Sequence, residues 1–215
     1  MSSIIVPAIL TETEDAYRAS VEKFKPFIKR VHIDISDGEF APVFLLDPEK
    51  LWWPKEWAVD IHAMVARPAD YVDRLIALKP NLITFHAETA INLVPFFDKI
   101  KKSGIKAGIA LLKPTVPATV AAMIKAADHV LVFTGDLGHY GGTASLMQLE
   151  KVRLIKAINP NVEIGWDGGA NLDNTFTLSQ GGVNVINVGA ALNNVDDPAD
   201  VYAKMVKETN KQGVI

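Results

Sequence analysis

The chain has 215 residues, of which 49% are hydrophobic and 22% are charged, and its formal net charge is −3. This balance argues against a nucleic acid or an anionic membrane as partner, because either would call for a basic face. The sequence contains no cysteine, which excludes disulfides, zinc–thiolate sites and thiol nucleophiles. Without a long apolar run or a leader-like segment, we expect a cytoplasmic protein.

Short β-rich runs alternate with longer helical stretches along the whole chain. Strands are predicted at residues 4–10, 30–36, 58–65, 82–86, 107–112, 129–134, 163–167 and 185–188. Helices are predicted at 13–25, 68–78, 91–103, 117–126, 145–158, 172–180 and 198–210. Thr11 and Thr13 are positioned to cap the first helix, and Pro68, Pro117 and Pro198 lie near the starts of three others.

The segment after the second strand, residues 40–57, is rich in proline and tryptophan and predicts a long loop with one short helix. Eight strands, each followed by a helix or a loop, imply parallel pairing through crossover connections. We therefore predict a single-domain (β/α)₈ TIM barrel over residues 1–215, with a doubly wound open sheet as the alternative.

Two histidines and two aspartates lie near the carboxyl ends of three predicted strands: His32, Asp34, His62 and Asp167. Residues two apart on a strand share a face, so His32 and Asp34 point the same way, toward the barrel axis. Two imidazoles and two carboxylates suit one divalent cation. Either histidine alone could instead be a hydrogen-bonded core residue. Asp60 lies one layer deeper, where a structural hydrogen-bond partner is the better interpretation.

Glycines follow the last three predicted strands: Gly141 and Gly142, then Gly168 and Gly169, then Gly189. Glycines there let backbone N–H groups approach a phosphate closely, and such loops are a recurrent phosphate site in these barrels. The alternative is that each set is an ordinary tight turn.

Three further polar residues are less clear. His86 faces inward on the fourth predicted strand, where lining the pocket and a polar core role both remain open. Asp136 and His139 lie in the loop after the sixth strand, where solvated side chains are expected.

In this order, the segments resemble the ribulose-phosphate 3-epimerase family over nearly the whole chain. The motifs that carry the resemblance are His32-Ile-Asp-Ile-Ser-Asp-Gly38, Asp60-Ile-His-Ala-Met64, Thr84-Phe-His-Ala-Glu88 and Trp166-Asp-Gly-Gly169.

The resemblance implies a barrel of the ribulose-phosphate-binding type, with one divalent metal ion (Zn, Fe, Mn or Co) at His32, Asp34, His62 and Asp167. It implies an isomerase that interconverts D-ribulose 5-phosphate and D-xylulose 5-phosphate through a cis-enediolate. By analogy, Asp34 would remove the C3 proton and Asp167 would deliver one from the opposite face.

The phosphorylated ketose is expected to contact Met64, Gly141, Gly142, Gly169, Gly189 and Ala190. The family also suggests a homo-oligomer.

The chain departs from the family in its pocket. Ala8 stands where the family has serine, and Ser36 and Phe133 stand where it has methionine, so that Met64 alone remains of that set. Ala190 replaces a serine, and the sixth loop, residues 134–142, carries an insertion. These changes leave open an epimerase of another ketose phosphate, such as D-allulose 6-phosphate, or a non-catalytic sugar-phosphate-binding barrel. A lyase or decarboxylase with an Asp-x-Lys-x-x-Asp motif is disfavoured, because Ser36 occupies the lysine position.

Overall fold

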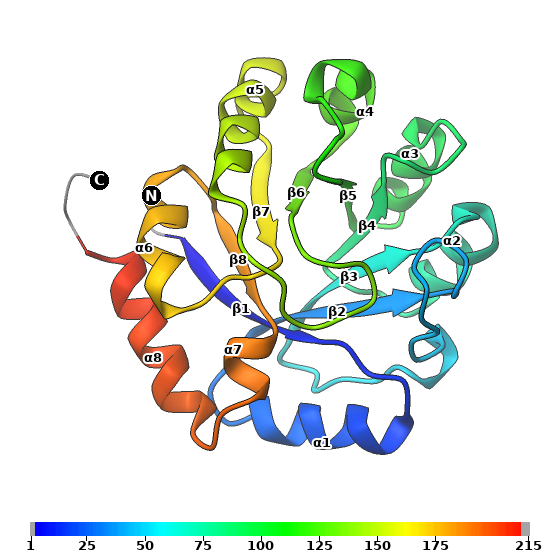
Figure 1. Ribbon diagram of the computed structural model, residues 1–215. Coiled ribbons are helices and arrows are strands. Elements are labelled where there is room, and N and C mark those ends of the chain that lie inside the picture. The colour runs from blue at the N-terminus through cyan, green and yellow to red at the C-terminus, as the bar shows by residue number, and fades with distance from the viewer. Residues whose placement is uncertain (1–2, 212–215) are drawn as a thin grey trace.

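Eight parallel strands close into a barrel in the computed structural model, which describes residues 3–211 (Figure 1). Every strand pairs with its neighbours in chain order, and β8 pairs with β1 from Ile4↔Val185 to Pro7↔Val188. That last pairing excludes the open-sheet alternative and confirms the predicted barrel. The strands are β1 (Ile4–Ile9), β2 (Arg30–Ser36), β3 (Ala58–Met64), β4 (Leu82–His86), β5 (Lys106–Leu111), β6 (His129–Phe133), β7 (Glu163–Asp167) and β8 (Val185–Val188).

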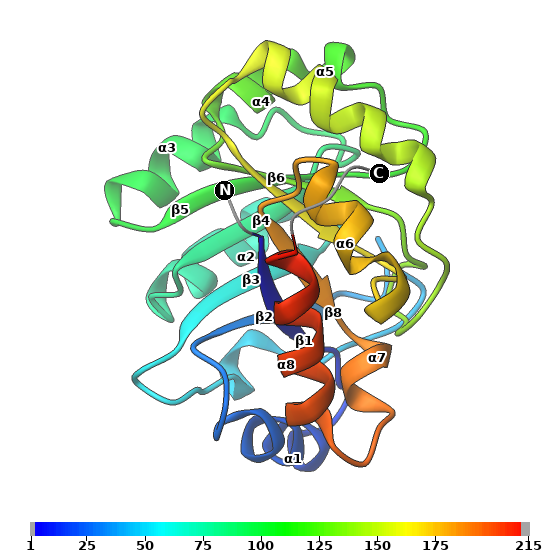
Figure 2. The same ribbon diagram turned by 90° about the vertical axis from the view of Figure 1, so that its left-hand side faces the viewer.

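Helices surround the strands as an outer ring (Figure 1). They are α1 (Glu14–Phe24), α2 (Pro68–Ala77), α3 (Val94–Lys102), α4 (Ala121–Ala126), α5 (Glu150–Ile158), α6 (Leu172–Gln180), α7 (Ala190–Asn193) and α8 (Pro198–Thr209). Figure 2 brings α8 to the front, where it packs on β1 between α1 and α6. Of residues 3–211, no helix is long and apolar enough to span a membrane.

The helix boundaries follow local chemistry. The Thr13 side chain accepts a hydrogen bond from the Ala16 amide and caps α1, as predicted, whereas Thr11 caps no helix. Pro68, Pro117 and Pro198 each occupy the first turn of a helical segment. A backbone N–H at this position makes no hydrogen bond within the helix, so proline loses none by lacking it.

The predicted element boundaries needed three kinds of correction. Five strand boundaries shift by one residue: β1, β3, β5 and β6 end one residue earlier than predicted, and β5 also begins one residue earlier. The helices predicted at 117–126 and 145–158 open as 3₁₀ helices, η2 (Pro117–Val120) and η3 (Leu146–Leu149). Helix α7 was not predicted, because four residues are too few to show a helical period. The predicted long loop at 40–57 does contain one short 3₁₀ helix, η1 (Pro48–Lys50).

The apolar core lies between the strands and the helix ring, while the interior of the barrel holds polar side chains at both ends. Along β2, the apolar residues Val31, Ile33 and Ile35 belong to this core, and the alternate residues, His32 and Asp34 among them, are polar. This two-residue alternation directs polar side chains to the barrel axis.

A paired network fills the end of the barrel where the strands begin. The Arg30 guanidinium donates to Asp60 over 2.6 Å and to both carboxylate oxygens of Glu163 over 2.9 and 3.1 Å. His129 Nδ1 lies 2.8 Å from Glu163, and the Asn81 amide donates to Asp60 over 2.7 Å. Asp60 is therefore a structural partner, as predicted. We call these five residues the floor network.

Candidate metal centre and active site

The carboxyl ends of β2, β3 and β7 bring His32, Asp34, His62 and Asp167 together. Asp34 lies beside His62 in the β2–β3 register, with Asp34 Oδ1 2.8 Å from His62 Nδ1 and 3.2 Å from His32 Nε2. Asp167 Oδ2 lies 3.3 Å from His32 Nε2 and 3.7 Å from His62 Nδ1. One ligand atom from each residue falls within 4.8 Å of all the others.

These spacings suit a single cation. Nitrogen and oxygen ligands bind zinc-like ions at about 2.0–2.2 Å, so neighbouring ligand atoms on one ion lie roughly 3.0–3.5 Å apart. The four measured separations, 2.8 to 3.7 Å, straddle that range. The donor set also fits, because imidazole and carboxylate together suit Zn²⁺, Fe²⁺, Mn²⁺ and Co²⁺. The cluster could therefore hold one divalent ion.

Electrostatics in the cluster favour charge on its members. Burial alone would lower the pKa of His32, but the adjacent Asp34 and Asp167 carboxylates raise it to about 10. Burial alone would raise the pKa of Asp34, but His32 and His62 hold it well below its usual range. The Asp34 carboxylate is thus ionised and attracts positive charge, which either a proton on His32 or a cation can provide.

His86 lies behind His62 rather than in the cavity. Its ring is fully buried, and its Nε2 is 2.8 Å from His62 Nε2. Burial, with a contribution from the neighbouring His62, lowers the pKa of His86 to about 4, so its imidazole is neutral. Of the two roles left open for this residue, the structure supports the polar core.

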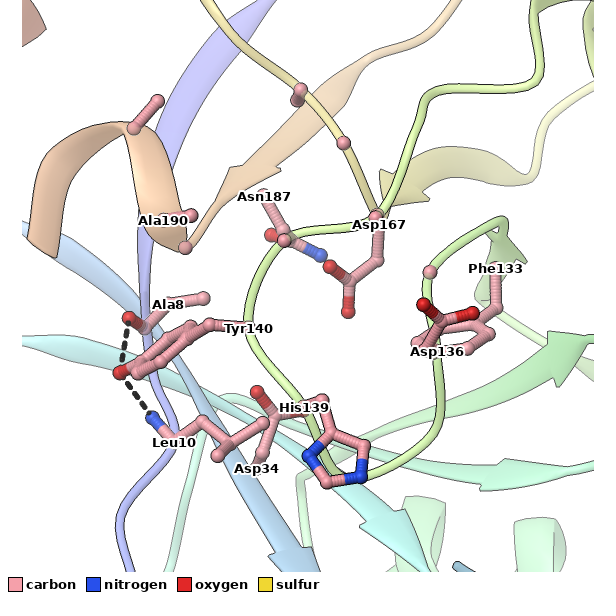
Figure 3. Close-up of a pocket in the computed structure, with 18 of the residues that line it drawn as sticks. Ala8, Leu10, Asp34, Phe133, Asp136, His139, Tyr140, Asp167, Asn187 and Ala190 are labelled. Carbon is pink, nitrogen blue, oxygen red and sulfur yellow. Dashed lines mark hydrogen bonds between the residues drawn. The ribbon is translucent and has the colours of Figure 1, made fainter. Parts of the chain in front are cut away.

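A cavity opens above the four candidate ligands and is drawn in Figure 3. Asp34 and Asp167 reach it from its floor, and Met64 and Phe133 contribute apolar surface. All the glycines considered above line it, together with Ala190: Gly141, Gly142, Gly168, Gly169 and Gly189. Two of the predicted metal ligands, Asp34 and Asp167, and all the residues predicted for substrate therefore line one space.

The sixth and seventh loops contact each other backbone to backbone at this cavity. The Gly169 amide donates to the Gly141 carbonyl over 3.2 Å, and both residues have a positive φ. A Cβ on Gly168 would overlap the Gly135 backbone. Glycine is needed here both for the backbone conformation and for the close approach of the two chains.

The sixth loop adds polar side chains to the cavity. The Tyr140 hydroxyl accepts a hydrogen bond from the Leu10 amide over 2.7 Å and donates to the Ala8 carbonyl over 3.4 Å, which ties this loop to β1 (Figure 3). Asp136 and His139 also line the cavity, although both are exposed. The expectation that they are merely solvated was therefore incomplete.

The sequence reasoning missed Asn187 on β8. Its side chain is 2% exposed and lines the cavity beside Asp167 (Figure 3). Within residues 3–211 its Oδ1 has no hydrogen-bond partner. An asparagine between the apolar Ile186 and Val188 is a two-residue alternation that could have revealed it.

The sequence is similar to known proteins over most of its length. A model of the ribulose-phosphate 3-epimerase family matches residues 4–193. The chain belongs to this family. Its relatives include the ribulose-phosphate 3-epimerase of Helicobacter pylori strain J99, 32% identical over 168 residues that cover 74% of this chain and 77% of the relative. The cytoplasmic isoform of Oryza sativa is 28% identical and covers 82% and 81% of the two chains.

Membership in the ribulose-phosphate 3-epimerase family makes the chain an isomerase. Solved structures support the fold. 3-Hexulose-6-phosphate synthase from Salmonella typhimurium superposes with a TM-score of 0.68 at 16% identity, covering 97% of this chain and 98% of that one. KGPDC from Streptococcus mutans gives 0.71 at 10% identity, with coverage of 97% and 98%.

Proposed function

We propose that this chain is a metal-dependent ketose-phosphate 3-epimerase that interconverts D-ribulose 5-phosphate and D-xylulose 5-phosphate. The observation that carries the proposal is the pair of carboxylates, Asp34 from β2 and Asp167 from β7, which face one cavity from two sides and belong to one His/Asp cluster (Figure 3). Family membership supports the same reaction class.

The chemical task is to remove and replace a proton at C3. A proton next to a ketone is too weakly acidic for a free carboxylate, and a cation held by His32, Asp34, His62 and Asp167 would stabilise the negative charge that develops. Asp34 removes the C3 proton and leaves a cis-enediolate. Asp167, which enters the reaction carrying a proton, then delivers that proton to the opposite face and inverts the centre, so that Asp34 ends protonated and Asp167 ionised.

The rest of the cavity is suited to a sugar phosphate. Gly141, Gly142, Gly169, Gly189 and Ala190 expose backbone to it and have no long side chain, so that amide groups can approach a phosphate. The Met64 side chain provides an apolar wall for the carbon chain. The phosphorylated ketose would thus lie with its phosphate on the glycine loops and C3 between the two aspartates.

Deuterium exchange at C3 in D₂O tests the assignment of the two aspartates. We expect Asp167→Asn to exchange the C3 proton of D-ribulose 5-phosphate while forming little D-xylulose 5-phosphate. Asp34→Asn should show the converse and exchange only the xylulose epimer. Metal content is measured on both variants, because an amide oxygen can still serve as a ligand. Wild-type protein that exchanges neither sugar would refute the proposal, and variants that exchange both equally would refute the division of roles.

A second candidate substrate is D-allulose 6-phosphate. The observation in its favour is the altered pocket, in which Ala8 offers no side-chain hydrogen bond and Tyr140 and Asn187 add polar groups. The same exchange assay on both sugars separates the two, through the ratio of their kcat/KM values. The homo-oligomer and the cytoplasmic location stay predictions.

A further inference from the structure

A hydrogen-bond chain of three side chains, His62, His86 and Glu88, leads from the metal cluster into the protein. His62 contributes Nδ1 to the cluster, and its other nitrogen, Nε2, lies 2.8 Å from His86 Nε2. On the far side of that ring, His86 Nδ1 lies 3.3 Å from Glu88 Oε2. The other carboxylate oxygen of Glu88 accepts hydrogen bonds from the Leu112 amide, over 2.9 Å, and from the Thr115 hydroxyl.

If every donor is to face an acceptor, this hydrogen-bond chain allows one arrangement of protons. A cation at His62 Nδ1 needs the lone pair of that nitrogen, so the His62 proton must be on Nε2. That proton then points at His86 Nε2, which must accept it and therefore carries no proton of its own. The His86 proton must be on Nδ1, where it points at a Glu88 carboxylate oxygen. Each step follows from the one before it.

Because of its surroundings, an unpaired donor or acceptor in this hydrogen-bond chain is costly. His62 and His86 are fully buried, and the His86 ring packs against Phe40 and Phe133 with centroid distances of 4.6 and 5.7 Å. Water has little access to replace a lost partner, and a buried donor without an acceptor costs about 1–3 kcal/mol. Although burial alone would raise the pKa of Glu88, its hydrogen bonds lower it, so the carboxylate is ionised and accepts only.

We propose that Glu88 and His86 are positioning residues that fix the tautomer and orientation of His62 and thereby set the affinity of the cluster for a divalent cation. Neither residue lines the cavity in which the substrate would bind, so both would act through His62. The inference rests on the cation of the proposed function and extends the site by two residues beyond its four ligands. Carboxylates that orient a ligating histidine strengthen metal binding in general, and here a second imidazole transmits the effect.

The decisive variant is Glu88→Gln, which keeps the size of the side chain and changes only its charge and its donors. The amide oxygen can still accept from Leu112 and Thr115, but the amide nitrogen then faces the His86 N–H, so two donors meet. Turning the amide around moves the conflict to the Leu112 amide. A tautomer change at His86 would relieve this conflict by placing the His86 proton on Nε2. His62 Nε2 would then have to accept that proton, so the His62 proton would move to Nδ1, the nitrogen that would bind the metal.

Metal affinity is the readout, measured by competition of Zn²⁺ with a chromophoric chelator and by the visible spectrum of the Co²⁺-loaded protein. We expect Glu88→Gln to raise the dissociation constant about tenfold and to shift the cobalt bands, and His86→Phe to raise it by up to about 100-fold. His86→Gln should recover part of the loss, because its amide oxygen can accept the His62 proton.

The chain provides a matched control in Glu163→Gln. Glu163 pairs with a buried histidine in the same way, through His129 Nδ1 at 2.8 Å, but at the opposite end of the barrel. We expect this variant to lower the melting temperature and to leave the dissociation constant and the cobalt spectrum unchanged. A role of Glu88 in packing alone would give the same pattern for Glu88→Gln.

The outcomes separate the two proposals. Wild-type protein that binds no stoichiometric divalent ion overturns both. The positioning role alone is overturned if the wild-type protein binds metal and exchanges C3 protons, but the dissociation constant of Glu88→Gln for metal is within twofold of the wild-type value. If Glu88→Gln fails to fold, the comparison of His86→Gln with His86→Phe decides, since equal affinities in these two would exclude the hydrogen bond as the cause.

Discussion

Substitution of Gly169 by alanine should damage substrate binding far more than it damages the fold. Gly169 has a φ of +70°, and a Cβ there would lie 2.6 Å from the Thr143 carbonyl carbon and closer still to the Ala144 amide nitrogen. Its neighbours are backbone atoms, so no side chain can rotate away. The sixth and seventh loops must separate, and these loops would bind the phosphate.

The magnitude follows from comparison with Gly104, which lies in the turn between α3 and β5, at the other end of the barrel. Gly104 has a similar φ, +77°, and nothing within 4 Å of the position of its Cβ. Gly104→Ala therefore incurs only the left-handed backbone strain, about 1–2 kcal/mol, or roughly 2–8 °C in melting temperature. Gly169→Ala adds a loop displacement of about 1 Å, and a misplacement of that size can lower kcat/KM about 100-fold.

The assay is steady-state turnover of D-ribulose 5-phosphate by both variants, with melting temperature and bound metal measured in parallel. We expect Gly104→Ala to retain the wild-type KM, and Gly169→Ala to raise KM strongly with its metal still bound. If the two variants have equal KM values, the assignment of these loops to phosphate binding is refuted.

Three further predictions concern the floor network, the sixth loop and the metal. Burial alone would raise the pKa of Glu163, but hydrogen bonds from His129 and Arg30 hold it well below its usual range. A lowered folded-state pKa gives stability that is present above the unfolded pKa of about 4.3 and lost as pH falls toward the folded value. Glu163→Gln should therefore destabilise the protein by about 2–3 kcal/mol at pH 7 and by progressively less below about pH 4, which urea titrations at both pH values will show. Tyr140→Phe removes the hydroxyl that accepts from the Leu10 amide and should raise KM several-fold with little change in kcat, and an unchanged KM would show that this tie is not needed. Removing the metal with a chelator should lower the melting temperature, and adding Zn²⁺ at about 1,000 times its dissociation constant should restore about 4 kcal/mol, whereas an identical melting curve would contradict a resident ion.

Much of the fold and the metal cluster could be predicted because both depend on short-range periodicity. In β2, the alternation of Val31, Ile33 and Ile35 with polar residues determines which side chains face the axis. Parallel strands in a closed barrel then bring such residues to one end, wherever they lie in the chain. Hence His62 and Asp167, about a hundred residues apart, could be assigned to one site from sequence alone.

Other contacts depend on tertiary distances that no local pattern encodes. Tyr140 reaches Leu10 across about 130 residues because the sixth loop folds over the barrel mouth. The contact between His86 and His62 depends on the rotamers of two rings on adjacent strands, so the sequence could show only that His86 faces inward. Helix α7 is held by the loop geometry around Gly189 rather than by a periodic apolar face.

The two polar layers of the barrel differ in the source of their positive charge, and this difference is a reason to expect a cation at one end only. In the floor network, the Arg30 guanidinium lies between two carboxylates, Asp60 and Glu163, and supplies its own positive charge. At the other end, all the ion pairs of Asp34 and Asp167 within residues 3–211 are with histidines, which are positive only when they carry an extra proton. As ligands of one ion, two carboxylate anions and two neutral imidazoles carry a charge of −2, and a buried charge of that size is costly without compensation. A divalent ion balances that charge and accepts a lone pair from each histidine, which the proton on His32 cannot do. The floor network thus contains a permanent cation of its own, whereas the cluster at the other end has the donor atoms to bind one.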